Sequence, residues 1–392
     1  MIPRALAGAL VGLLVASCDG SGGAPATGAP KPLPLVDYLG GPVIASPKVV
    51  TVTYDGDTQR DLLESFDDDI TQTGWWDAVR AGYCDGGTPK TCVGRGGSGG
   101  HVHLAEAPPA ALDDGPAGGA LRVLLDGYFT SGTFPPPDSD TIYVVHLPAS
   151  TGVLVDGWAQ SCVVFTGYHA SFDVSLPGAA TTAVPYIVIP SCTAADDDLT
   201  STASHELIET ATDPVDPDPA LGGDAYSLTT DTVWPLAAGS EVADLCSWPD
   251  DHDSYVEGPY TVVRSWSNLA AAAGHDPCVP ADPASGPYFG VAPVAEAITM
   301  PVGASTTLEL DAFADGARQA WDVSVVDVSK AIDGTAGAAT FALDRAVAST
   351  DARLHLSIHA KSPAPADHPV LLMIVSSDGT TTNRWPLSIT VQ

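Results

Sequence analysis

The sequence predicts an α+β domain followed by an all-β domain in a chain of 392 residues. Two observations support this prediction. Before residue 283, short apolar strand-like runs alternate with segments of helical periodicity. After it, only short alternating runs remain, separated by Gly, Asp and Pro turns, which is typical of a β-sandwich. We therefore expect domains over residues 36–282 and 286–392.

The first 17 residues have the features of a secretory signal peptide. Arg4 supplies a positive charge, residues 5–15 form an apolar run too short to span a bilayer, and Val15-Ala16-Ser17 offers small residues for cleavage. Cys18 follows directly, and the order Val-Ala-Ser-Cys resembles a bacterial lipobox, in which the Cys is lipidated. A signal peptide followed by a chance Cys is the alternative. Residues 18–35 then form the lipidated Cys and a flexible tether.

The domain of residues 36–282 is expected to mix strands and helices. Strands are predicted by β-branched or alternating runs at residues 48–54, 141–147, 162–166 and 185–189. Helical periodicity predicts one or two helices over residues 62–81 and another over 114–128. Residues 94–100 are Gly-rich but lack the Lys-Ser/Thr of a phosphate loop, so we interpret them as a turn or a flexible flap.

The most informative segment is a helix predicted over residues 199–211. Its apolar positions form one stripe, at Leu199, Ala203, Leu207, Ile208 and Ala211. His205, Glu206 and Glu209 fall on the other side and are expected to face a cleft. The chain has 48 acidic residues but only eight Glu, and Glu206, Glu209 and Glu241 are three of them. A solvated acidic face with one incidental His is the alternative.

This helix resembles the active-site helix of the zincin metallopeptidases, whose pattern is His-Glu-x-x-His. The resemblance implies a mixed sheet above the helix, His205 as a zinc ligand and Glu206 as the general base. Glu209 stands where the second His would be and is the expected second ligand, with Glu241 or Asp244 completing the site. A carboxylate ligand weakens the preference for zinc over calcium or manganese, so calcium stays an alternative.

Other histidines compete for the third position. His169 follows a predicted strand and is the alternative ligand. His101 and His103 would share a face of a strand about 7 Å apart and could reach one metal, although an exposed pair is the simpler interpretation. Structural or solvated roles are expected for His146, His252 and His275.

Six cysteines remain after Cys18, and an even number in an exported chain favours disulfides over thiol chemistry. Proximity in sequence suggests the pairs Cys84–Cys92, Cys162–Cys192 and Cys246–Cys278, among about 15 connectivities that six cysteines allow. The third pairing would exclude Cys246 as a metal ligand.

The charge balance argues against some partners. A formal net charge of −33 with only 15 Lys and Arg repels nucleic acid and anionic lipid head groups, whereas cations are attracted. Charged residues make up only 16% of the chain, so the acidity reflects missing basic residues as much as added Asp. Solubility of an exported protein explains most of it.

Several motifs together resemble a family of secreted bacterial proteins that is distantly similar to the plant phosphate-induced (EXORDIUM-like) proteins. They lie over about residues 48–282 and comprise His205-Glu206-Leu207-Ile208-Glu209, Ala211-Thr212-Asp213-Pro214, Glu241-Val242-Ala243-Asp244-Leu245-Cys246, Trp266-Ser267-Asn268 and Cys278. Plant members are extracellular, are linked to growth and the cell wall, and generally lack the His-Glu pair. The resemblance implies topology and secretion rather than catalysis.

The C-terminal domain is expected to be an immunoglobulin-like sandwich. Its strands are predicted at residues 306–310, 320–326, 354–358 and 370–375. We interpret this domain as an accessory for spacing or adhesion.

The sequence thus favours a lipid-anchored protein of the bacterial cell envelope or surface. Its preferred function is zinc-dependent hydrolysis, with a peptide or another cell-envelope substrate, and its membrane contact is through the anchor only. A non-catalytic surface or matrix-binding protein, with structural calcium or no metal, is the alternative.

Overall fold

The computed structural model describes residues 31–392 except 116–118, 175–181, 193–194, 216–222, 230–232, 249–250, 253, 282–285, 330–334 and 336. The predicted signal peptide and Cys18 lie outside the described residues. Within them, no helix is long and apolar enough to cross a membrane.

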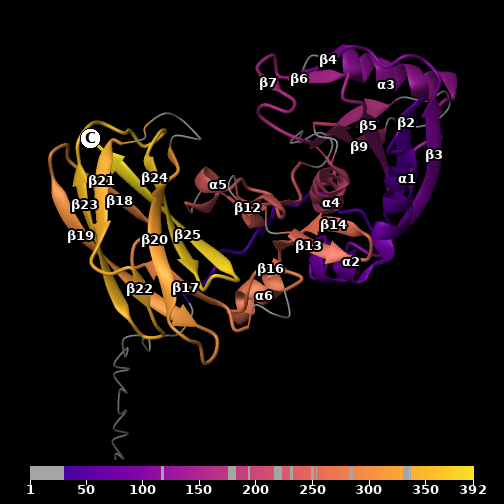
Figure 1. The fold of residues 1–392 in the computed structure, drawn as a ribbon. Coiled ribbons are helices and arrows are strands. Elements are labelled where there is room, and N and C mark those ends of the chain that lie inside the picture. The colour runs from indigo at the N-terminus through magenta and orange to yellow at the C-terminus, as the bar shows by residue number, and fades with distance from the viewer. Residues whose placement is uncertain are drawn as a thin grey trace, which may run out of the picture.

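A five-stranded mixed sheet organises the N-terminal part (Figure 1). Its order is β3-β2-β5-β9-β8. The strands are β2 (Lys48–Tyr54), β3 (Gly97–Leu104), β5 (Thr141–Leu147), β8 (Tyr168–Val174) and β9 (Thr182–Pro190). Pairing is parallel from β3 to β9, and only the edge strand β8 runs antiparallel to its neighbour. The expected mixture of helices with a mixed sheet is confirmed, but the mostly parallel pairing makes this part α/β rather than the predicted α+β.

Helices cover both faces of this sheet because its strands are apolar on both sides. One face packs against α1 (Arg60–Asp69) and α4 (Asp196–Thr212), burying Val144 and Ile187 with Leu207. The other packs against α3 (Ala120–Ser131). The sheet is therefore the middle layer of three, and α4 lies under its β9–β8 end.

Shorter elements complete this part. They are β1 (Asp37–Tyr38), η1 (Ile70–Gln72), α2 (Gly74–Val79), β4 (Ala111–Asp114), β6 (Gly152–Val155), β7 (Ala159–Gln160), β10 (Tyr226–Ser227), α5 (Trp234–Ala237), η2 (Asp244–Cys246), β11 (Ser247–Trp248), β12 (Asp251–His252), β13 (Ser254–Glu257), β14 (Tyr260–Val263), β15 (Ser265–Trp266), α6 (Asn268–Ala273) and β16 (Cys278–Val279). The hairpin β13–β14 packs against α4 on the side away from the sheet.

Three local predictions were wrong. The Gly-rich segment 94–100 is not a flap, since β3 begins at Gly97 and pairs with β2. Glycine is required there because a Cβ on Gly99 would lie 2.7 Å from Cγ2 of Val50. The helix expected from residue 114 begins only at Ala120, because Asp114 ends β4 and is buried, with its carboxylate accepting hydrogen bonds from Arg122 and Tyr186.

The third error concerns the strand expected over residues 162–166. This segment is a turn in which Cys162 has a φ of 63°, a left-handed conformation that does not belong in a strand. The strand β8 begins later, at Tyr168. The residue that follows, His169, therefore lies within a strand rather than after one.

The C-terminal part consists of two sheets, to the left in Figure 1. One has the order β17-β19-β23-β21 and the other β18-β25-β24-β20-β22. Their bounds are β17 (Phe289–Pro293), β18 (Ala297–Met300), β19 (Ser305–Ala314), β20 (Trp321–Asp327), β21 (Ala339–Leu343), β22 (Val347–Ala348), β23 (Arg353–Ala360), β24 (Val370–Ser377) and β25 (Thr382–Val391). The four strands predicted here lie in β19, β20, β23 and β24, so the all-β expectation is confirmed.

Aromatic side chains join the two parts. The Trp234 ring centroid lies 5.3 Å from that of Trp266 and 5.5 Å from that of Trp385 on β25. Lys31 pairs with Glu296 at 3.1 Å and lies over the Trp385 ring. The apolar core is continuous through this contact.

The six cysteines form the three expected pairs, Cys84–Cys92, Cys162–Cys192 and Cys246–Cys278. Such bonds form and persist outside the reducing cytosol. The disulfides therefore indicate an extracellular protein.

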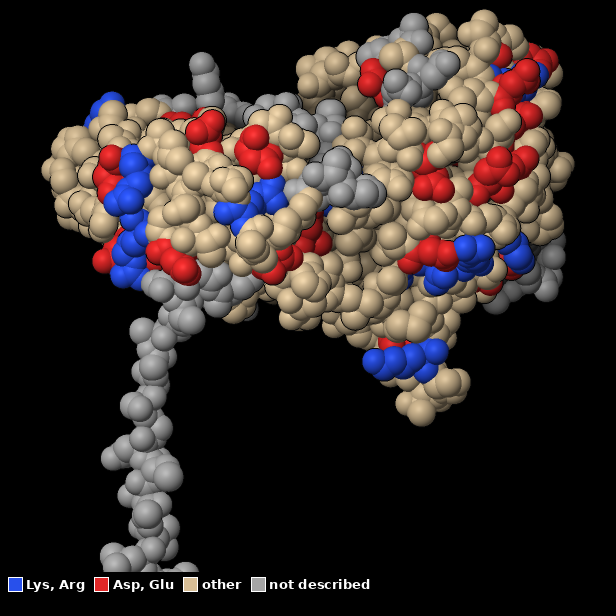
Figure 2. Space-filling model, turned by 60° about the horizontal axis from the view of Figure 1, so that its bottom comes forward, with Lys and Arg blue, Asp and Glu red and all other residues tan. Residues whose placement is uncertain are grey.

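Basic residues are few, and most of those that the structure describes form ion pairs. Arg80 and Arg95 both pair with Asp77, and Arg264 pairs with Asp276. On the face shown in Figure 2, the basic side chains lie next to acidic ones, and further acidic groups lie alone between uncharged residues.

Candidate metal centre

The centre is built on α4, whose two sides have different roles. All five residues of the predicted apolar stripe are buried, with Leu207 1% and Ile208 0% exposed. The helix begins three residues earlier than expected and ends at Thr212. Glu206 and Glu209 on the other side are buried as well, at 6% and 2% exposure. The alternative interpretation of this side as a solvated acidic face is therefore wrong. These carboxylates need polar or cationic partners, because an isolated buried charge is costly.

A first group of partners consists of His205, Glu209 and Asp244, whose ligand atoms all lie within 4.8 Å of one another. The Nε2 atom of His205 is 3.1 Å from Oε2 of Glu209 and 3.5 Å from Oδ1 of Asp244. His205 and Glu209 are one helical turn apart and so share a face. Asp244 comes from η2, and the structure thus brings together three residues that the sequence selected.

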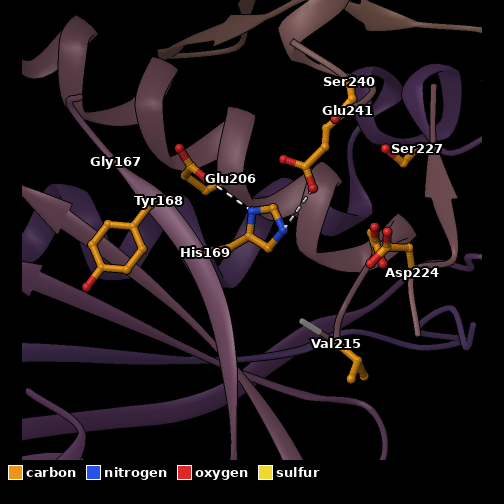
Figure 3. Close-up of a pocket in the computed structure, with 10 residues that line it drawn as sticks. Gly167, Tyr168, His169, Glu206, Val215, Asp224, Ser227, Ser240 and Glu241 are labelled. Atoms are coloured by element: carbon orange, nitrogen blue, oxygen red, sulfur yellow. Dashed lines mark hydrogen bonds and ion pairs between the residues drawn. The ribbon is translucent and has the colours of Figure 1, made fainter. Parts of the chain in front are cut away.

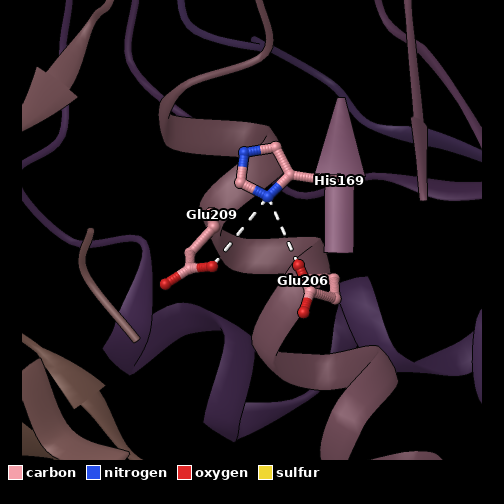
Figure 4. A group of neighbouring side chains, drawn as sticks. All are labelled: His169, Glu206 and Glu209. Carbon is pink, nitrogen blue, oxygen red and sulfur yellow. Dashed lines mark hydrogen bonds and ion pairs between the residues drawn. The ribbon is translucent and has the colours of Figure 1, made fainter. Parts of the chain in front are cut away.

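A second group consists of His169, Glu206 and Glu209, with ligand atoms again within 4.8 Å of one another (Figure 4). The Nδ1 atom of His169 is 3.3 Å from Oε2 of Glu206 and 3.9 Å from Oε2 of Glu209. His169 is paired with Ile187 across β8 and β9, and Ile187 packs in the core shared with α4. The strand therefore points His169 at the helix.

Glu241, a predicted ligand, lies outside both groups. Its Oε1 is 3.3 Å from Nε2 of His169, so His169 stands between Glu206 and Glu241 (Figure 3). Both carboxylates line a cavity of about 390 Å³, together with Gly167, Tyr168, His169, Asp213, Val215, Asp224, Ser227 and Ser240. The cavity gives this side of the centre access to a bound molecule.

Backbone amides fix Glu209 in place. Its Oε1 accepts hydrogen bonds from the N–H groups of Ala243 and Asp244, both 3.1 Å away. Oε2 is left facing His205 and His169. The segment from Glu241 to Asp244 thus contributes backbone hydrogen bonds to Glu209 as well as side chains to the centre. A pattern of side chains in the sequence does not reveal these backbone hydrogen bonds.

The carboxylates of the centre favour positive charge on the groups beside them. Burial alone would lower the pKa of His205, but Glu209 and Asp244 outweigh it and raise that pKa well above its usual value. The pKa of His169 is raised in the same way, against burial, by Glu241 and Glu206. Burial raises the pKa of Glu209 to about 8, while neighbouring His205 opposes the shift. For Glu241 the histidines outweigh burial, and its pKa is lowered.

The donor set fits a divalent transition metal. Each group offers one imidazole nitrogen and two carboxylates; imidazole suits zinc, copper, iron or nickel, whereas calcium takes oxygen ligands. Metal-binding histidines usually have a partner on their second nitrogen. Here Nε2 of His169 has Glu241, and Nδ1 of His205 lies 3.4 Å from the Ser247 hydroxyl.

The other histidines considered as metal ligands lie away from this centre. His101 and His103 lie on β3, at the opposite edge of the sheet, against Glu64 and Asp68 of α1. His146 is buried beside Asp67 and His275 is exposed beside Asp315, which agrees with structural roles. Ser247 and the buried Asp213 belong to the site and were not predicted as such.

The chain matches no protein-family model and no curated protein sequence. Solved structures similar to it include a chimeric titin Z1Z2 functionalised with a KLER exogenous peptide from decorin, at 13% identity, a TM-score of 0.18 and coverage of 27% of this chain and 93% of that one. Titin M4 matches at 12% identity and a TM-score of 0.17, covering 27% and 95%. Titin M3 matches at 12% identity and a TM-score of 0.18, covering 27% and 96%. These matches concern the β-rich C-terminal part and not the candidate metal centre.

Proposed function

We propose that this protein is an exported metal-dependent hydrolase that cleaves peptide bonds, with zinc held by His205, Glu209 and Asp244. The observation that supports it most is the convergence of these three ligand atoms within 4.8 Å of one another. Bound zinc would polarise a carbonyl and lower the pKa of a water molecule towards about 7.

Each side chain has a distinct task in this proposal. Glu209 is fixed by the Ala243 and Asp244 amides, so its charge stays in one position. Ser247 orients the His205 ring. Glu206, whose carboxylate lines the cavity, would accept the proton of the attacking water as general base.

The edge strand β8 supports a peptide as substrate. It is the last strand of the sheet order, and its first residues, Tyr168 and His169, line the cavity. An extended peptide could add to such an edge through backbone hydrogen bonds. Its scissile bond would then lie near Glu206, which lines the same cavity.

Export through a lipidated Cys18 is part of the proposal. The disulfides support an oxidising compartment, and the anchor is tested by metabolic labelling of an expressing bacterium with a clickable fatty acid. Labelled wild type and unlabelled Cys18→Ser protein are expected. An unlabelled wild type would remove the anchor from the proposal.

The enzymatic test uses disulfide-bonded protein lacking residues 1–17, purified without chelator. Wild type is expected to contain transition metal, to cleave a fluorogenic peptide library, to lose activity with a chelator and to regain it with Zn²⁺. Glu206→Gln should reduce cleavage by about 100-fold or more, while the matched variant Glu257→Gln, at a half-buried position on β13 away from the centre, should not. A wild type free of transition metal and without peptidase activity would instead favour a non-catalytic binding protein.

A further inference from the structure

We infer that the cleft holds two divalent metal ions, the second on His169, Glu206 and Glu209, with Glu209 shared between both. This inference rests on the proposed function, which supplies the first ion on His205, Glu209 and Asp244. It changes one assignment within it, because Glu206 becomes a ligand instead of the base. The chemistry stays hydrolytic, with a two-metal centre in place of a single ion.

The first argument is geometric. The two three-residue groups have only Glu209 in common, and each has its own histidine and its own second carboxylate. Oε2 of Glu209 faces both histidines, at 3.1 Å from His205 and 3.9 Å from His169. An oxygen placed between two imidazoles in this way suits a bridging ligand, and ions in two-metal hydrolytic sites lie about 3.5–4 Å apart.

The second argument concerns the outer partners of the histidines. Nδ1 of His169 faces Glu206 and Glu209, while its Nε2 faces Glu241 at 3.3 Å. His205 has the reverse arrangement, with Nε2 towards the carboxylates and Nδ1 towards Ser247. Each ring therefore presents one nitrogen to a ligand group and secures the other outside it, as metal-binding histidines do. Glu241 is then the carboxylate that orients His169, which accounts for its absence from both groups.

The third argument is charge balance. Glu206, Glu209, Glu241 and Asp244 place four carboxylates around the two histidines, and within the described residues all their ion pairs are with those histidines. One divalent ion on His205, Glu209 and Asp244 would leave Glu206 and Glu241 with only His169 as a cationic partner. Two divalent ions balance four carboxylates, and Glu206 and Glu209 are too deeply buried for water to screen the excess.

Metal stoichiometry tests the inference without relying on activity. Apoprotein is loaded with excess Mn²⁺ or Zn²⁺, freed of unbound metal by gel filtration and analysed by mass spectrometry. Two ions per chain are expected for wild type. His169→Ala and Glu206→Gln should each leave one ion, as should His205→Ala and Asp244→Asn.

The outcomes separate the two proposals. One ion in wild type, retained in His169→Ala and Glu206→Gln and lost in His205→Ala, would overturn the second ion and leave the single-ion hydrolase standing. No ion in wild type would overturn both. Spin-coupled Mn²⁺ pairs in the electron paramagnetic resonance spectrum of wild type are a further expected result, and they do not depend on any variant folding.

His101→Ala is the matched control. His101 belongs to the other cluster of histidine and carboxylates, with Glu64 and Asp68 on α1. This variant should keep two ions. Loss of an ion in it would place the second ion at the opposite edge of the sheet and overturn the inference.

Discussion

The Oε2 atom of Glu209 lies 3.1 Å from Nε2 of His205, one turn earlier on α4, while Oε1 of the same carboxylate is held by two backbone amides. Glu209 thus has one oxygen committed to the fold and one directed at the histidines. It is the residue on which both candidate groups depend.

Glu209→Gln should therefore have the largest effect on metal binding of any single substitution. Gln is nearly the same size and can still accept the two amide hydrogen bonds, but it removes the negative charge. We expect affinity for Zn²⁺ to fall by about 100-fold or more, measured by calorimetric titration of apoprotein. The thermal midpoint of the apoprotein should be unchanged or higher, because a buried charge is removed. An affinity equal to that of wild type would contradict both metal proposals.

Removing the Cys162–Cys192 disulfide should destabilise the protein more than removing Cys84–Cys92. The two bonds span 30 and 8 residues, and a longer closed loop restricts the unfolded chain more. A cost of about 2–4 kcal/mol is expected for the double Ser variant at 162 and 192, measured by urea unfolding. Metal affinity should also fall, because Cys192 and His205 line the same hollow; a disulfide that only closes a loop would leave it unchanged.

Asp213 makes stability depend on pH in the apoprotein. Burial raises the pKa of this carboxyl from 3.8 to about 7, although the Ala225 amide opposes the shift. Between these values the folded state binds the proton and the unfolded state does not, so stability falls as pH rises from about 4 to 7. The penalty is absent below pH 4 and complete above pH 7.

Asp213→Asn should remove this dependence, because Asn can accept the same hydrogen bond from Ala225 but has no charge. Unfolding free energies measured with chelator between pH 4 and 8 should show a smaller decline in the variant than in wild type, by on the order of a few kcal/mol. If the unfolding free energies of the two proteins changed with pH in parallel, ionisation of Asp213 would not destabilise the folded state.

Asp276→Ala should destabilise the fold through a buried ion pair. Arg264 is 4% exposed and donates to Asp276 at 2.6 Å and to the Pro280 carbonyl at 2.8 Å. Taking away the carboxylate leaves a buried cation less well compensated, which costs about 3 kcal/mol. The control is Asp138→Ala, which breaks the half-exposed pair with Lys48 and should cost less than about 1 kcal/mol.

Much of the fold could be predicted because many of its helices and strands follow from the pattern of apolar residues within the segment itself. The alternation of Lys48–Tyr54 predicted β2 with its observed bounds, and the four-residue spacing of the apolar stripe predicted α4 to within three residues at each end. Predictions were wrong where contacts with residues distant in the sequence determine the local backbone conformation. Gly97–Leu104 is a strand because β2 lies beside it, and residues 162–166 turn because Cys162 is tied to Cys192.

The sequence alone predicted that His205 and Glu209 share a face of a helix, because an α-helix has 3.6 residues per turn. It also supplied the paired cysteines and the acidic segment that contains Asp244. The packing of distant elements brings Asp244 against His205 and Glu241 against His169, and it buries Glu206 beside β8. These contacts depend on the packing of β8 and η2 against α4. That packing is set by the whole core and its disulfides, and no local pattern of residues encodes it.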